Sequence, residues 1–114
     1  KQQDIYHSYS PMVDVMSQID ATKKIYLIVH GQRQLIDTVK DKLAAKFDKG
    51  NMQPASLEKA GDVGEYVAMI WPPMAPNEIV VSQITGENPA GEGARGMGAW
   101  GTVAMKELLR LPLK

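Results

Sequence analysis

A glycine-rich segment near the C-terminus has the spacing of a phosphate-binding loop. The run Gly91–Gly96 reads G-E-G-A-R-G and matches G-x-G-x-x-G, in which glycines let pyrophosphate approach the backbone at a helix N-terminus. Dinucleotide folds place this motif early in a βαβ unit, with an acidic residue about 20 positions later. We expect neither feature here, because the sequence stops at Lys114, and Glu92 would repel phosphate. The context of the motif therefore disfavours a dinucleotide site, although its spacing matches.

His30 is a second candidate for chemistry. It follows an apolar run and precedes a helical pattern, and ligands often bind where strands end in α/β sheets. His30 could be a general base or a ligand contact, or a histidine that is merely hydrogen-bonded at a strand end. Together with Arg95 and the loop Gly91–Gly98, it gives one hypothesis, a small-ligand (anion) binding protein or a small enzyme. The alternative for the glycines is a flexible loop.

Metal-binding patterns are weak. The chain has no cysteine and two histidines, which is too few for a zinc site. Seven methionines could ligate Cu(I), but Met12, Met16, Met69 and Met105 fit core positions, where methionine fills gaps. We therefore expect no metal and no other cofactor.

The segment from Trp71 to Pro76 is unusual for a turn. Its first residues, Trp71, Pro72, Pro73 and Met74, are apolar, whereas hairpin tips usually carry small polar residues. Rigid prolines present apolar side chains at low entropic cost, which suits a partner surface. The alternative is that Trp71 folds back over the sheet. The sequence thus makes these four residues candidates for partner binding.

Hydrophobic periodicity predicts the elements that position these residues. Residues 25–29 form a continuous apolar run typical of a strand covered on both faces, and residues 33–47 follow with a helical stripe. Strands at 65–71 and 78–85 predict an antiparallel hairpin. The remaining predictions are a loose N-terminal segment at 1–10, a short helix from Pro11, an edge strand at 52–57, a glycine-rich loop at 86–98 and a helix at 100–111.

These elements predict one α+β domain over residues 1–114. We expect a small mixed or antiparallel sheet of three to four strands, with helices packed mainly on one face. The formal net charge is zero, which argues against a general affinity for nucleic acid. The longest apolar run is far shorter than a membrane span. Because the sequence begins with Lys1, a signal peptide or lipidated cysteine could precede it, and any membrane attachment would use that anchor.

Two segments resemble a unit of TraT-type surface-exclusion lipoproteins and related accessory lipoproteins of conjugation and secretion machines. They are TKKIYLIVHGQRQLIDTVKDKLAAKF, from Thr22, and GDVGEYVAMIW, which ends at Trp71. The resemblance consists of a strand, a helix and a second strand, and it carries over no functional residue. It implies a periplasmic or outer-membrane setting and a role in protein–protein contact. With no catalytic signature in the sequence, we expect a non-enzymatic interaction domain of the bacterial cell envelope.

Overall fold

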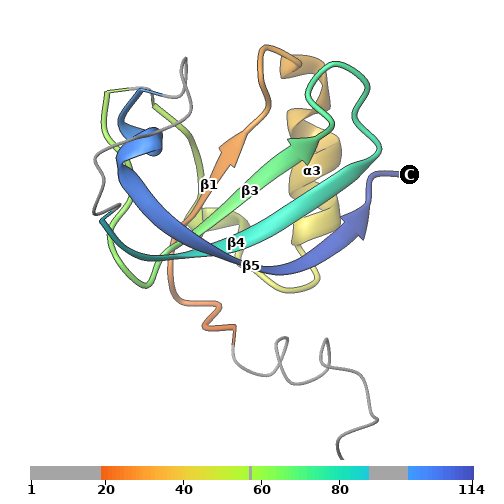
Figure 1. Cartoon of the computed structure of the whole chain (residues 1–114). Coiled ribbons are helices and arrows are strands. Elements are labelled where there is room, and N and C mark those ends of the chain that lie inside the picture. The colour runs from red at the N-terminus through yellow and green to blue at the C-terminus, as the bar shows by residue number, and fades with distance from the viewer. Residues whose placement is uncertain (1–18, 57, 88–97) are drawn as a thin grey trace, which may run out of the picture.

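The computed structural model describes residues 19–56, 58–87 and 98–114 and shows one mixed five-stranded sheet (Figure 1). Its strand order is β2 (Met52–Pro54), β1 (Ile25–Ile28), β3 (Tyr66–Trp71), β4 (Glu78–Glu87) and β5 (Val103–Pro112). Strands β2, β1 and β3 are parallel, and β3, β4 and β5 are antiparallel. The α+β class is thus confirmed, but the sheet has five strands and not three to four.

One face of the sheet is covered by the helix α3 (Ile36–Leu43). Its apolar stripe, Val39 and Leu43, is buried together with Phe47 against strand residues of all five strands. The 3₁₀ turn η1 (Arg33–Leu35) leads into α3, and η2 (Lys49–Asn51) leads from it towards β2. The predicted helix at 33–47 is therefore confirmed, with a shorter α-helical part and 3₁₀ geometry at its start.

The opposite face has a second, smaller core. Ile28, Val67 and Ile84 from three strands are buried there under Trp100, which lies in the 3₁₀ turn η3 (Gly98–Thr102). The connection from β2 to β3 also crosses this face, where Ala55 and Ala60 pack against the cluster. The chain therefore links its parallel strands through a helix on one face and through an irregular segment on the other.

The predicted helix at 100–111 is wrong. Only the first residues form a 3₁₀ turn, and the rest is the edge strand β5, whose residues 103–112 pair with β4. Leu108 is an extra residue in this pairing, because Val81 lies opposite Leu109 whereas Ser82 lies opposite Glu107. Such a bulge shifts the alternation of faces. Met105 consequently packs on the Trp100 side, while Leu109 and the leucines after it pack on the α3 side.

The other predicted strands are present. β1 ends one residue early, β3 and β4 form the expected hairpin, and β2 is a short edge strand that includes Pro54. Gly86 and Glu87 belong to β4 and not to a loop. The N-terminal segment, the helix from Pro11 and residues 88–97 lie outside the described residues. Within the described part of the chain, no helix has the length and apolar character to cross a membrane.

Candidate functional site

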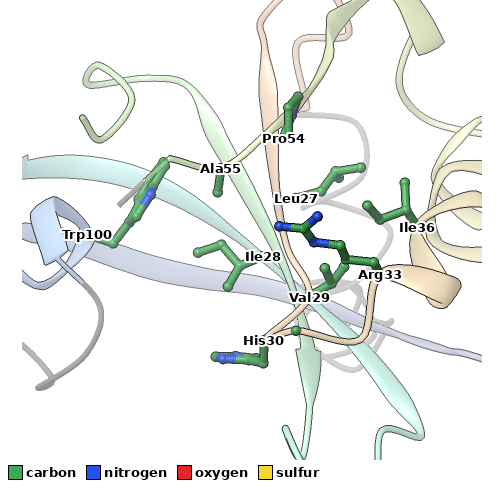
Figure 2. Close-up of a pocket in the computed structure, with 10 residues that line it drawn as sticks. Leu27, Ile28, Val29, His30, Arg33, Ile36, Pro54, Ala55 and Trp100 are labelled. Atoms are coloured by element: carbon green, nitrogen blue, oxygen red, sulfur yellow. The ribbon is translucent and has the colours of Figure 1, made fainter. Parts of the chain in front are cut away.

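A pocket of about 620 Å³ opens at the carboxyl ends of the parallel strands β1 and β2 (Figure 2). Ligand sites favour this position in sheets with parallel strands. Most of its lining is apolar and comes from the ends of β1 and β2, the start of α3 and the turn η3. The apolar lining residues include Leu27, Ile28, Val29, Ile36, Pro54 and Ala55.

The pocket is open because β2 ends before β1 does. The amide of Ala55 donates to the carbonyl oxygen of Leu27 at 3.1 Å, and the register of the two strands ends at Leu27 and Pro54. Strand alternation points the next amide on that edge, that of Val29, towards the space where β2 would have continued. Among the described residues, no acceptor bonds this amide. A backbone donor therefore faces the pocket.

His30 reaches the pocket through a tight turn. Its φ is 49° and that of Gly31 is 82°, and the amide of Gln32 closes the turn by donating to the Val29 carbonyl oxygen at 2.8 Å. Histidine tolerates positive φ better than most residues do, at a cost of roughly 1 kcal/mol. The exposed ring of His30 lies at the pocket's edge.

Among the described lining residues, Arg33 is the other charged or ionisable one, and no pattern in the sequence singled it out. It lies in the first turn after His30-Gly31, with its guanidinium directed across the opening (Figure 2). Among the described lining residues there is no aspartate or glutamate, and within the described ranges no carboxylate lies within 4.0 Å of the Arg33 guanidinium. The pocket therefore combines an apolar floor with a cationic rim.

Trp100 forms one wall and is held firmly. It is 2% exposed, and its Nε1–H donates to the Ser56 carbonyl oxygen at 2.8 Å. Its ring centroid lies 5.3 Å from that of Tyr26, in a tilted arrangement. The sequence predicts Trp100 only as the first residue of a helix. The signal that could have singled it out is an isolated aromatic between Gly98 and Gly101.

A polar network fixes Tyr26 beside this wall. Its hydroxyl donates to Glu65 Oε1 at 2.9 Å, and the amide of Asp62 donates to the same oxygen at 2.7 Å. Burial of the phenol and its bond to Glu65 raise the pKa of Tyr26 to about 12. The segment that crosses the Trp100 face is thereby tied to β1.

The hairpin tip, residues 71–77, lies at the same end of the sheet as the His30 turn, because β1 and β3 are parallel. Trp71 is 44% exposed and Met74 is 90% exposed, so Trp71 is not folded into the core. Pro72 is exposed and Pro73 is half-buried. Gln32 Nε2 donates to the Pro73 carbonyl oxygen at 3.4 Å and connects the tip to the turn beside the pocket.

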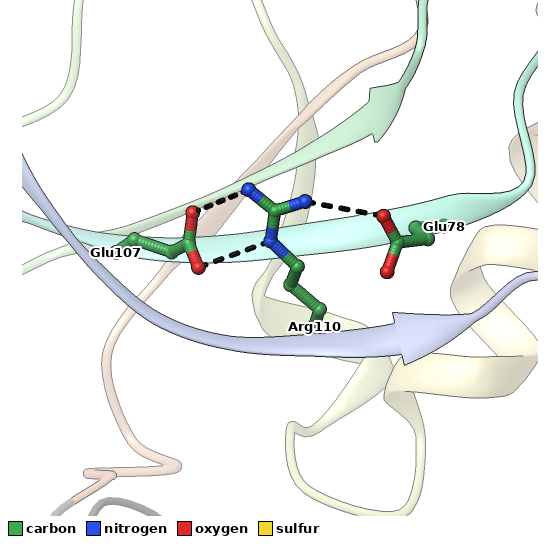
Figure 3. Close-up of polar contacts among 3 residues, drawn as sticks. All are labelled: Glu78, Glu107 and Arg110. Carbon is green, nitrogen blue, oxygen red and sulfur yellow. Dashed lines mark hydrogen bonds and ion pairs between the residues drawn. The ribbon is translucent and has the colours of Figure 1, made fainter.

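A charged cluster on β4 and β5 consists of Glu78, Arg110 and Glu107 (Figure 3). Glu78 lies opposite Trp71 in the strand register, and it accepts a hydrogen bond from Arg110 Nη1 at 3.1 Å. Arg110 also makes two bonds to Glu107, and these lower the pKa of the Glu107 carboxyl. The exposed apolar tip is thus bordered by a polar rim.

Of the predicted site residues, the structure places His30 at the pocket and the four residues from Trp71 to Met74 at the tip. Arg95 and most of the Gly91–Gly98 loop lie outside the described residues. In the parts that are described, no group of three or more His, Asp or Glu side chains could hold a metal ion. Comparison of the chain with family models, curated proteins and solved structures finds no match.

Proposed function

We propose that this protein is a non-enzymatic protein-interaction domain of the bacterial cell envelope, an accessory component of a conjugation or secretion assembly. The observation that carries the interaction role is the exposure of Trp71 and Met74 on a hairpin tip that is held in one shape. The envelope setting rests on the sequence resemblance to TraT-type and related lipoproteins.

Several hydrogen bonds support the view that the tip is preformed. Inside it, the amide of Ala75 donates to the Pro72 carbonyl oxygen and that of Asn77 to the Trp71 carbonyl oxygen, at 3.2 and 3.1 Å. From outside, the amide of Leu113 donates to the Asn77 carbonyl oxygen at 3.0 Å. A surface that is already ordered loses little conformational entropy on binding.

The composition of the tip also fits a binding surface. Tryptophan and methionine are enriched at protein interfaces, and a central apolar anchor with a polar border is the usual arrangement. Trp71 and Met74 supply the anchor, and the cluster of Glu78, Arg110 and Glu107 supplies the border. A partner surface with an apolar hollow and polar groups around it would fit this tip.

Site-specific photo-crosslinking in the native host tests the proposal. A photoreactive residue replaces Met74 in one variant and Val63 in a matched control, since Val63 is also an exposed apolar residue, at 64% exposure. We expect a discrete protein adduct from position 74 that disappears when Trp71→Ala is added, and no such adduct from position 63. Equal labelling at both positions would show that the tip crosslinks nonspecifically and would contradict the proposed interaction role.

Cell fractionation tests the envelope setting separately. The native gene product, with its own N-terminus, is followed into periplasmic, membrane and cytoplasmic fractions. We expect it in the periplasm or with the outer membrane. Recovery in the cytoplasm would overturn the envelope setting but leave the interaction role of Trp71 and Met74 to be decided by the crosslinking result.

A further inference from the structure

We propose that the pocket between β1, β2 and Trp100 is a binding site for a small organic monoanion with an apolar body, such as a medium-chain carboxylate. The anionic group would lie against Arg33 and the Val29 amide, and the apolar body would lie on the strand ends. This role is independent of partner binding through Trp71 and Met74.

The size and lining of the pocket argue for an apolar body. Its volume of about 620 Å³ falls within the roughly 300–1,000 Å³ usual for small-molecule sites. The strand ends contribute Ile28, Val29 and Ala55, and α3 contributes Ile36. Such a surface gives a purely inorganic anion few contacts. An aliphatic or aromatic body would be desolvated there with a gain of roughly 25 cal/mol per Å² of apolar area.

The charges argue for an anionic head group. The Arg33 guanidinium is a cation, and no described residue of the lining is a carboxylate that could neutralise it. A guanidinium fork matches the two oxygens of a carboxylate. The Val29 amide, at the end of β1 beside the pocket, is a second donor, and His30 is a third polar group at the rim. Among the described lining residues Arg33 is the one permanent cation, and a single cation favours a monoanion over a nucleotide or a diphosphate.

Trp100 makes the binding measurable. It forms a wall of the pocket, and the chain has only one other tryptophan, Trp71 at the tip. In the Trp71→Phe variant, the emission therefore reports on Trp100 alone. Octanoate is the probe, 1-octanol is the neutral analogue, and inorganic phosphate is the anion without an apolar body. We expect saturable emission changes with octanoate, and much weaker binding of 1-octanol and phosphate.

Two variants with the same charge change distinguish specific binding at the pocket from a general effect of the protein's net charge. Arg33→Gln should weaken octanoate binding about tenfold, because a charge-assisted hydrogen bond is lost. Lys42→Gln removes a positive charge from the exposed end of α3 and should leave the affinity unchanged within about twofold. Arg33→Lys, which keeps the charge, should bind with intermediate affinity. Thermal unfolding of each variant checks that it is folded.

Amide NMR locates the bound probe. Octanoate should shift the resonances of Val29, His30 and Gly31, and leave that of Met74 unchanged. The proposal is overturned if octanoate gives no saturable change up to about 10 mM, if 1-octanol or phosphate binds as well as octanoate, or if Lys42→Gln weakens binding as much as Arg33→Gln. Loss of crosslinking at Met74 with octanoate binding intact would refute only the proposed interaction role.

Discussion

The two tryptophans lie over the same face of the sheet, yet their surroundings differ completely. Strand alternation puts Trp71 on the face of Val67 and Met69, which is the face that Trp100 covers. Trp100 is 2% exposed and hydrogen-bonded, whereas Trp71 is 44% exposed. The difference shows that one end of this face is a core and the other end is a surface.

The two ends of this sheet face differ because different segments cover them. The β2–β3 connection and η3 bring Ser56, Gly61 and Trp100 over one end, and they enclose Tyr26. At the other end, the strand register places Glu78 of β4 opposite Trp71, and Arg110 of β5 is bonded to Glu78. An apolar residue with the same sequence character can therefore stabilise the fold in one place and remain available for binding in another.

Trp100→Ala should give the largest change in stability. It removes a fully buried aromatic and leaves a cavity between Ile28, Val67 and Ile84, which costs roughly 3–5 kcal/mol of unfolding free energy. Urea unfolding followed by circular dichroism measures this. A loss below about 1 kcal/mol would mean that Trp100 is not part of a real core.

Gly61→Ala should cause the next largest loss of stability. A Cβ at Gly61 would lie 2.3 Å from Cε2 of the Tyr26 ring, which is itself held by Trp100 and Glu65. Such overpacking costs roughly 1–3 kcal/mol. Gly86→Ala is the matched control, because a Cβ there meets nothing within 4 Å. Equal stabilities of the two variants would contradict the close packing.

Tyr26 should make stability depend on pH in the alkaline range. Its pKa rises from 10.0 to about 12 on folding, so the neutral phenol is favoured in the native state. This contribution is fully present below pH 10 and is lost as the pH rises through 12, because the unfolded chain ionises first. The difference in unfolding free energy between wild type and Tyr26→Phe, measured by urea titration, should shrink over that interval. If the difference stayed constant over that interval, the raised pKa of Tyr26 would be contradicted.

Trp71→Ala should change stability least, by less than about 1 kcal/mol, because a half-exposed side chain at the sheet's end loses few contacts. The matched comparison is Trp100→Ala under the same conditions. Acrylamide quenching sharpens the contrast without a stability measurement, since Trp71 in a Trp100→Phe variant should be quenched far more readily than Trp100 in a Trp71→Phe variant. Similar quenching of the two tryptophans would contradict the assignment of Trp100 to the core and of Trp71 to the surface.

The sequence alone determined the elements whose periodicity is local. The run at 25–29, the amphipathic pattern of α3 and the proline-rich β3–β4 hairpin are each visible within one window, and His30 was placed correctly at a strand end. These elements also indicated the α+β class, since alternating strand and helix patterns leave few arrangements for one small domain.

Only the tertiary structure decided β5 and the pocket. Residues 103–112 contain good helix formers, and their pairing with β4 overrides that preference, while the bulge at Leu108 hides the period of two from any local pattern. Arg33 and Trp100 are far apart in sequence and line the same pocket only because β2 ends early and η3 folds over the sheet. Contacts between distant segments leave no periodic trace in the sequence, so that site could not be predicted from it.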